Sequence, residues 1–459
     1  MKRFDAIVIG AGQAGPSLAS RLTSAGMSVA VIERKLFGGT CVNTGCMPTK
    51  TLVASARAAH VARHASDWGV VVEGAVSVDM KRVKARADAV SSRSRTGIES
   101  WLEKMDRCTV FRDHARFTSA HTVRVGDDEL SAERIFINVG GRARVPPLRG
   151  LDRVSYLTNT TILALDEVPR HLVVVGGSYV GLEYAQMYRR FGSEVTVVEM
   201  GPRLVSREDP EVSAAIREIL EREGVAFRLD AKCISLAPAE GGVSVGVDCA
   251  RGDPAIAGSH VLLAVGRQPN TEDLGLDRAG VKVDAHGYVV VDDELRTNVD
   301  GVWALGDCNG RGAFTHTAYN DYEIVAANLL DGDRRRLSDR IVAYALYIDP
   351  PLGRAGLTET EAASRGRPLL VGRRPMSRVG RAIEKGETQG FMKIIVDAET
   401  KKILGAAILG TEGDEAVHGI LDVMYAGATA TTLQRTVPIH PTVSELIPTV
   451  LAEAAPPAG

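Results

Sequence analysis

One structural unit occurs twice in this chain, and this repetition constrains the fold more than any other feature. Residues 5–9 (DAIVI) are typical of a buried parallel strand, and a glycine-rich turn, a helix to about residue 25 and a second strand ending in Glu33 follow. Residues 172–175 (LVVV) begin the same order of elements, which ends in Glu199 at the same spacing. Two such units predict two doubly wound, Rossmann-type nucleotide-binding domains.

Each glycine turn has a physical reason. In the first, Gly10 allows a tight bend, Gly12 lets the backbone approach a pyrophosphate, and Gly15 lets the helix pack on the strand. The pyrophosphate would lie on free N–H groups at the helix N-terminus, and Glu33 would accept a hydrogen bond from a ribose hydroxyl. A lone motif of this kind can be a plain turn, but two complete copies predict two dinucleotide sites. The expected contacts are Gly10, Gly12, Ala14, Gly15 and Glu33 in the first, and Gly176, Ser178, Tyr179, Val180, Gly181 and Glu199 in the second.

Later apolar runs complete these units. IFINVGG (135–141) and HVLLAVGRQPN (260–270) are expected to be strands whose ends approach a cofactor at Gly140, Gly266 and Arg267. After about residue 339 the pattern favours antiparallel strands, with helices near 412–426 and 443–453, which predicts an α+β C-terminal domain. The tail, AAPPAG, is expected to be disordered.

Of the six cysteines, only Cys41 and Cys46 are close in sequence. A disulfide needs Cα atoms within about 7 Å, so the segment must bend, which Gly45 makes easier. A helix that starts near Cys46 would lower the pKa of its thiol. A zinc half-site would need two further ligands at short spacing, and none is nearby, so we assign no metal site. The pair could also be two unrelated core cysteines, but the spacing favours redox chemistry.

The net charge of −2 offers no basic excess for nucleic acid or an anionic membrane. No apolar run approaches the roughly 18 residues that span a bilayer. We therefore expect a cytoplasmic protein that binds neither nucleic acid nor membrane.

With these motifs, the chain resembles the class I pyridine nucleotide–disulfide oxidoreductases, which include dihydrolipoamide dehydrogenase, glutathione reductase and mercuric reductase. GGTCVNTGCMPTK (38–50) resembles their redox-active disulfide motif, ALGD (304–307) their second FAD motif, and HPTVSE (440–445) their C-terminal active-site motif. The resemblance extends over essentially the whole chain. It implies FAD, NADH or NADPH, and four domains: FAD-binding (1–149), NAD(P)-binding (150–270), a central domain that completes the FAD site (271–338) and a dimerisation domain (339–459).

The resemblance also implies residue roles. Cys46 is the flavin-facing thiolate that gives a charge-transfer complex, and Cys41 is the thiol that attacks the substrate. Lys50 lies near the flavin N5 and pairs with Glu183, while Tyr179 covers the nicotinamide pocket until the coenzyme displaces it. Further FAD contacts are implied for Gly39, Thr40, Ala115 near the adenine, Asp307 on the ribityl chain and Thr315 beside the flavin ring.

His440 and Glu445 suit acid–base chemistry, because imidazole exchanges protons near neutral pH and a carboxylate fixes its orientation. A histidine before proline can equally be a plain turn residue. The family motif favours the catalytic role and places this pair on the other subunit, so the resemblance implies a homodimer with a shared active site.

Departures from the family pattern narrow the choice of relative. Glu199 suits the free ribose hydroxyl of NADH, although Arg203 leaves NADPH open. No cysteine follows Cys308, so the C-terminal metal-delivery pair of mercuric reductase is missing. The DPPLGRAGLTE segment (349–359) is similar to mercuric-reductase-like flavoproteins, a branch that includes reactive-chlorine-stress flavin reductases. The expected acceptor is a disulfide, a metal ion or an oxidant; the alternatives are dihydrolipoamide dehydrogenase and a direct flavin reductase of quinones or oxygen.

Overall fold

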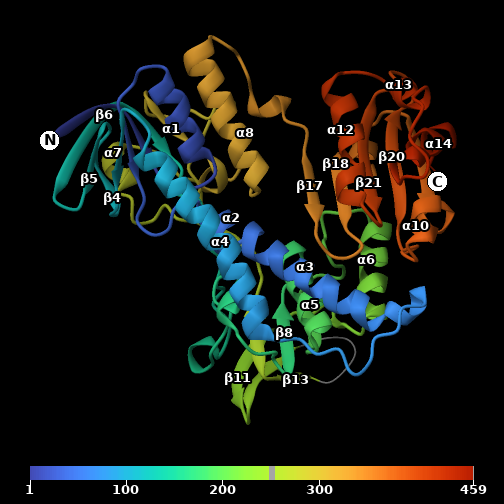
Figure 1. Ribbon diagram of the computed structural model, residues 1–459. Coiled ribbons are helices and arrows are strands. Elements are labelled where there is room, and N and C mark those ends of the chain that lie inside the picture. Colours follow the sequence, from blue (N-terminus) through green and yellow to red (C-terminus); the bar gives the residue numbers. More distant parts are fainter. Residues whose placement is uncertain (248–253, 458–459) are drawn as a thin grey trace.

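The computed structural model describes residues 1–247 and 254–457 (Figure 1). The first glycine turn belongs to a seven-stranded sheet, in which β1 (Lys2–Ile9) pairs in parallel with β2 (Val29–Ile32) and β6 (Asp128–Ile137). The sheet has the order β3-β2-β1-β6-β5-β4, and β16 (Val302–Ala304) adds to β6 in parallel. The remaining strands are β3 (Cys108–Phe111), β4 (Ala115–Ser119) and β5 (Thr122–Val125).

Two helices pack side by side on this sheet, α1 (Ala14–Ser24) and α8 (Thr315–Ala326). Leu18 and Leu22, one turn apart on α1, are fully buried, as the core-facing side of an amphipathic helix should be. The helix α8 is distant from α1 in sequence but packs against it. The segment after residue 300 therefore folds back onto the first nucleotide unit.

The second glycine turn belongs to a separate parallel sheet of order β10-β9-β8-β14. It contains β8 (His171–Val175), β9 (Glu194–Val198), β10 (Ala226–Arg228) and β14 (His260–Leu263), with helices α5 (Tyr179–Phe191) and α6 (Pro210–Arg222). An antiparallel ribbon follows, made of β11 (Ser235–Ala239), β12 (Gly242–Gly246) and β13 (Ala255–Gly258). Both predicted doubly wound units are therefore present.

Three helices and a short ribbon join the two nucleotide units. The helices α2 (Gly39–Thr44), α3 (Cys46–Arg63) and α4 (Met80–Glu103) run from one unit to the other, and α3 packs against α5 (Figure 1). The ribbon pairs β7 (Gly141–Ala143) with β15 (Arg267–Pro269). This arrangement brings the ends of both predicted companion strands close to the redox helices.

The C-terminal part is an antiparallel five-stranded sheet of order β17-β18-β21-β20-β19, covered by short helices. The predicted α/β fold with a C-terminal α+β domain is confirmed. The strands are β17 (Ala343–Leu346), β18 (Leu352–Gly356), β19 (Leu369–Pro375), β20 (Phe391–Asp397) and β21 (Ile403–Leu409), and the helices include α9 (Glu359–Ser364), α10 (Gly380–Glu384), α11 (Gly413–Ala416), α12 (His418–Tyr425), α13 (Ala430–Gln434) and α14 (Ile447–Ala452).

The prediction of a disordered tail is wrong at Ala455. The Val371 N–H donates to the Ala455 carbonyl at 2.8 Å, and the Ala455 N–H donates back at 3.2 Å. The physical reason is that β19 is an edge strand, whose unpaired backbone groups offer partners to an extended segment. Elsewhere, none of the helices in the described ranges is long and apolar enough to cross a membrane.

Candidate active site

The redox segment bends where the sequence predicts. Helix α2 ends at Thr44, Gly45 leaves the helical conformation (φ −139°, ψ −121°), and α3 begins at Cys46. A Cβ at Gly45 would lie 2.9 Å from the Thr40 carbonyl oxygen, so only glycine fits this junction easily. Both thiols are free, with Cys41 half-buried and Cys46 exposed.

The two thiols differ in acidity. A hydrogen bond from Cys41 lowers the pKa of Cys46 to about 6 against the effect of burial, and the Thr315 hydroxyl and the Lys50 charge act in the same direction as Cys41. The Cys46 sulfur lies 3.1 Å from Thr315 Oγ1. The same thiol–thiol hydrogen bond and burial raise the pKa of Cys41. Of the two thiols, Cys46 is therefore the one whose surroundings favour the thiolate.

Lys50 lies one helical turn beyond Cys46 and forms an ion pair with Glu183 of α5, 2.5 Å from nitrogen to oxygen. Glu183 is buried and also accepts the Tyr347 N–H at 3.0 Å. The Lys50 nitrogen lies 4.6 Å from the centroid of the Tyr347 ring. Sequence reasoning missed Tyr347, and the only signal for it is its position just before the DPPLGRAG segment.

The first glycine turn forms a narrow cradle. A Cβ at Gly15 would lie 2.3 Å from the Gly10 carbonyl oxygen, and one at Gly39 would lie 2.9 Å from the Gly12 Cα. Glu33 binds this turn directly, because its carboxylate accepts the Ala11 N–H at 3.0 Å. The start of α2 thus lies against the turn at the beginning of α1, where helix N–H groups suit a pyrophosphate.

Residues near 267 and 307 extend this cradle. Arg267 bonds to Asp307 at 3.1 Å, to the Gly141 carbonyl at 2.6 Å and to Thr40 Oγ1 at 3.4 Å. Beside them, Gly140 and Gly266 have positive φ, and a Cβ at either would meet no atom within 4 Å. These two glycines face open space beside a chain of polar groups, which leaves room for an extended dinucleotide.

Ala115 is buried at the start of β4, away from the cysteines. The preceding residue, His114, has its ring nitrogen 3.4 Å from Arg34, which follows Glu33. Ala115 therefore lies close to the segment that follows Glu33.

The second glycine turn repeats the arrangement of the first. Glu199 accepts the Gly177 N–H at 2.7 Å and the Gly201 N–H at 2.8 Å. A Cβ at Gly181 would lie 2.0 Å from the Gly176 carbonyl oxygen, whereas Ser178 is extended and exposed and needs no glycine. Val180 is also exposed, so this turn presents the start of α5 to solvent.

Tyr179 is the first residue of α5 and lies between the two nucleotide sites. Its ring meets the rings of Tyr344 and Phe314 edge-on, with centroids 5.3 Å and 6.4 Å away. Burial raises the pKa of its hydroxyl to about 12. An aromatic side chain held in this way can act as a cover for a neighbouring site.

His440 and Glu445 meet as predicted, with Nδ1 2.8 Å from the carboxylate oxygen. The His440 side chain is 80% exposed, whereas that of Glu445 is 15% exposed. Among the described residues of this single chain, no hydrogen bond joins the pair to Cys41 or Cys46.

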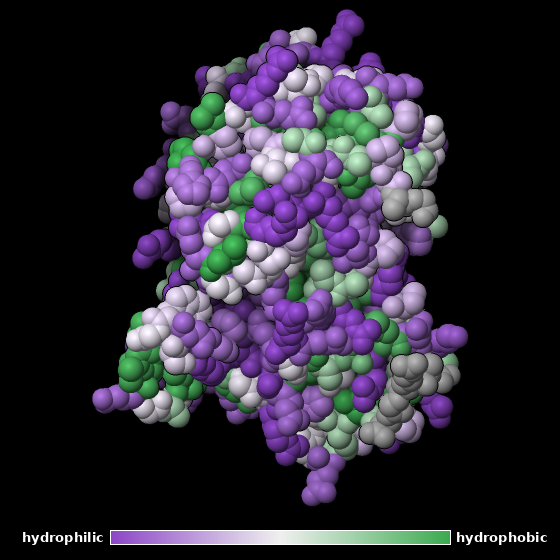
Figure 2. All heavy atoms as spheres, turned by 90° about the vertical axis from the view of Figure 1, so that its right-hand side faces the viewer, coloured by the Kyte–Doolittle hydropathy of each residue, from purple (hydrophilic) through white to green (hydrophobic). Residues whose placement is uncertain are grey.

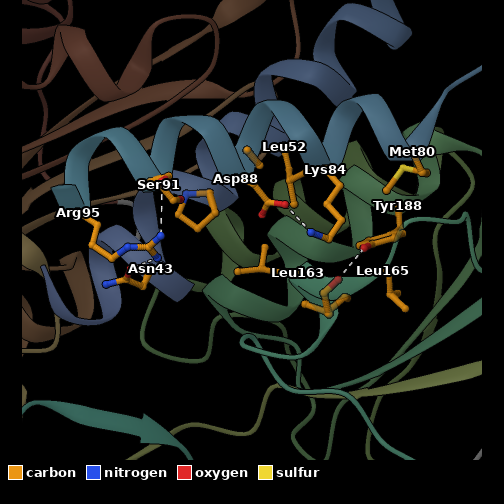
Figure 3. Close-up of a pocket in the computed structure, with 14 residues that line it drawn as sticks. Asn43, Leu52, Met80, Lys84, Asp88, Ser91, Arg95, Leu163, Leu165 and Tyr188 are labelled. Carbon is orange, nitrogen blue, oxygen red and sulfur yellow. Dashed lines mark hydrogen bonds and ion pairs between the residues drawn. The ribbon is translucent and has the colours of Figure 1, made fainter. Parts of the chain in front are cut away.

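A cavity of about 280 Å³ lies behind the redox helices (Figure 3). At one end, Arg95 of α4 donates to the Asn43 side-chain oxygen at 3.3 Å. The Asn43 amide in turn donates to the carbonyls of Phe37 and Gly39 at 2.8 and 2.9 Å. Helix α4, which sequence reasoning did not anticipate, thus braces the helix that carries Cys41.

Comparisons with known proteins agree with this geometry. Residues 4–321 match the model of the pyridine nucleotide-disulphide oxidoreductases, and residues 342–451 match the dimerisation domain of the same family. The chain belongs to this family. It is an FAD-dependent oxidoreductase that uses a pyridine nucleotide, and its dimerisation domain indicates a homodimer.

Individual relatives cover nearly the whole chain. The probable pyridine nucleotide-disulfide oxidoreductase RclA of Escherichia coli is 35% identical over 97% of this chain and 98% of its own length. A dihydrolipoyl dehydrogenase of Thermus scotoductus is 34% identical (97% and 96%), and a mercuric reductase of Streptomyces lividans is 33% identical (94% and 92%). The solved Cu(II) complex of HOCl-induced flavoprotein disulfide reductase RclA superposes with a TM-score of 0.90 at 34% identity, over 98% of this chain and 99% of that one.

Proposed function

We propose that this enzyme passes electrons from NADH through FAD to the Cys41–Cys46 pair, and from there to a small disulfide, metal-ion or oxidant acceptor. The observation that carries the proposal is the pair of thiols of unequal acidity at the α2–α3 junction. When bound, the flavin accepts a hydride from the nicotinamide and delivers two electrons to the disulfide.

The surrounding residues then have distinct roles. Cys46 faces the flavin as a thiolate, and its charge is stabilised by the Thr315 hydroxyl. Cys41 attacks the acceptor. The Lys50–Glu183 pair fixes a positive charge one turn from Cys46, which favours the thiolate and the reduced cofactor.

The His440–Glu445 pair would serve the active site of the other subunit. Its exposed imidazole and fixed carboxylate support this role, because the ring is oriented but has no hydrogen bond to the redox segment of its own chain among the described residues. There it would accept the proton of the Cys41 thiol and return it to the leaving group of the acceptor.

NADH is the proposed coenzyme. The Glu199 carboxylate lies at the second glycine turn, where it would repel a 2′-phosphate and accept a hydrogen bond from a free ribose hydroxyl. Arg203 could counter this charge, but its guanidinium donates to the Ser206 carbonyl at 3.2 Å, which supports the NADH preference.

Cupric ion is the first acceptor to test, since RclA, the relative described above, has a solved Cu(II) complex. In this step the Cys46 thiolate and the Cys41 thiol lose two electrons and one proton and form a disulfide, while two Cu(II) ions become two Cu(I) ions. Thiolates suit Cu(I), which favours this direction. Dihydrolipoamide dehydrogenase activity is the main alternative, supported by the similar identity of those relatives.

The deciding experiment is an anaerobic titration of the holoenzyme with NADH and, separately, NADPH, followed by visible absorbance. We expect a long-wavelength band at the two-electron stage, which reports a thiolate against oxidised flavin, and loss of acceptor turnover in Cys41→Ser. Cys233→Ser is the control, because Cys233 is a free thiol outside the redox segment. Direct bleaching of the flavin without that band, and full turnover by Cys41→Ser, would establish a direct flavin reductase instead.

A further inference from the structure

A stacked aromatic pair forms the surface on which Tyr179 rests. The rings of Phe314 and Tyr344 lie nearly parallel, with centroids 5.6 Å apart and an interplanar angle of 16°. The Tyr179 ring stands almost perpendicular to both, at 89° and 82°. Two edge-on contacts therefore hold Tyr179 in place.

The position of Tyr344 is fixed by buried charges. Its hydroxyl donates to Glu208 at 2.6 Å, and the other oxygen of that carboxylate lies 3.8 Å from the Arg354 Nε. Arg354 is directly opposite Tyr344 in the β17–β18 ladder and is only 1% exposed, while Glu208 is 3% exposed. The Arg354 guanidinium makes no hydrogen bond with the described residues and is held by charge alone, so the hydrogen bond to Glu208 is the contact that fixes the Tyr344 ring.

This cluster joins two parts of the fold. Glu208 immediately precedes the segment that opens α6 of the second nucleotide unit, whereas Tyr344 and Arg354 belong to the C-terminal sheet above it (Figure 1). The next residue, Asp209, continues the junction by accepting the Lys393 nitrogen at 2.9 Å and the Glu359 N–H at 3.0 Å. The surface under Tyr179 is thus anchored in both parts.

Tyr179 itself is held only moderately. Its hydroxyl is buried and lies close to the Tyr344 hydroxyl, but it makes no hydrogen bond of regular geometry with the described residues, which costs free energy in this position. The edge-on contacts favour the position and the unsatisfied hydroxyl opposes it. Such a balance suits a side chain that must leave its place when a ligand arrives.

We propose that Tyr344, fixed by Glu208 and Arg354, is a positioning residue that sets how readily Tyr179 moves aside, and thereby the apparent affinity for the nicotinamide coenzyme. The inference rests on the covering role that the family resemblance implies for Tyr179. A coenzyme that binds only the open form pays for opening, so its apparent affinity rises when the closed form loses a contact.

The test measures binding of a tetrahydronicotinamide analogue of NADH, which cannot donate a hydride, to the FAD-loaded dimer by calorimetry. One aromatic edge contact corresponds to about a two- to twelvefold change in an equilibrium constant. Tyr344→Leu should therefore lower the dissociation constant by about that factor. Tyr319→Leu is the control, because Tyr319 makes a similar edge-on contact with Tyr322 elsewhere on α8.

A double-mutant cycle separates positioning from general damage to the fold. In a Tyr179→Ala background, Tyr344→Leu should no longer change the affinity, since the side chain that it positions is gone. The proposal is overturned if Tyr344→Leu leaves the affinity unchanged or weakens it, or if its effect persists without Tyr179. If Tyr344→Leu cannot retain FAD, Tyr344→Phe decides: a smaller tightening supports the proposal, and no tightening overturns it. Because no turnover is measured, the result is independent of whether the thiol pathway holds.

Discussion

The hydrogen bond between Thr315 and Cys46 allows the pKa of the thiol to be changed through a single side-chain hydroxyl. Hydrogen bonds to charged groups contribute about 1.5–3 kcal/mol, and one pKa unit corresponds to about 1.4 kcal/mol. Cys46 is exposed, so the lower end applies, and Thr315→Val should raise its pKa by about one unit, from about 6 to about 7. The sign follows because the hydroxyl donates to the thiolate, and losing that donor favours the protonated form.

The assay is a pH titration of the long-wavelength band in the anaerobic, two-electron-reduced enzyme. A depressed pKa means that the band is present above the midpoint and disappears as the pH falls through it. Thr315→Ser is the matched control, since serine keeps the hydroxyl, and its midpoint should stay near that of the wild type. Equal midpoints for Thr315→Val and Thr315→Ser would refute the reasoning, because the side-chain hydroxyl would then not stabilise the thiolate.

Three further outcomes are expected. Glu199→Gln should raise the ratio of kcat/KM for NADPH to that for NADH by about tenfold, equivalent to about 1.4 kcal/mol of lost repulsion, while the amide oxygen of glutamine can still accept one of the two backbone N–H groups. An unchanged ratio in steady-state assays would exclude the carboxylate as the selectivity determinant. His440→Gln should slow acceptor turnover by about 10²–10⁴-fold and leave stopped-flow flavin reduction by NADH unchanged. Arg190→Met should lower the free energy of unfolding, measured in urea, by about 3–5 kcal/mol, because the buried guanidinium holds two carboxylates. The control Arg217→Met, in an exposed helical ion pair, should lower it by at most about 0.5 kcal/mol. Similar losses of stability in the two variants would contradict this reasoning.

Local patterns predicted the parts of the fold that local chemistry dictates. The two glycine turns had to follow buried strands and precede helices, and the structure places them there. The bend at Gly45 was predictable for the same reason, since the geometry of two cysteines five residues apart demands it. In contrast, no local sequence pattern predicted the long helix α4. The pairing of Ala455 with Val371 was also not predictable, because it depends on an edge strand that is distant in sequence.

The residues of the candidate site also divide into those that sequence motifs predict and those that only tertiary packing brings into place. Lys50 and Glu183 could be paired from family motifs, and they meet in the structure. Tyr347, Tyr344 and Arg354 could not be identified, because each acquires its place only when the C-terminal sheet packs against the second nucleotide unit. A buried arginine in a strand has no sequence signature that separates it from an exposed one, so its role depends on tertiary contacts alone.

The loop that carries His440 shows how the oligomer and the chemistry depend on each other. The Glu445 N–H is fixed by the Thr442 hydroxyl at 3.2 Å, and Arg381 holds the Pro441 carbonyl at 2.7 Å, so the imidazole is presented on a rigid support. Val437 and Ile439 beside it are 96% and 79% exposed, on a molecule whose face on the side of the C-terminal domain is largely hydrophilic with scattered apolar patches (Figure 2). Strongly exposed apolar side chains beside a rigidly held His–Glu pair are typical of a surface that a second subunit covers. The association that covers these side chains would therefore also deliver the imidazole to the other chain, so that dimerisation and catalysis would be lost together.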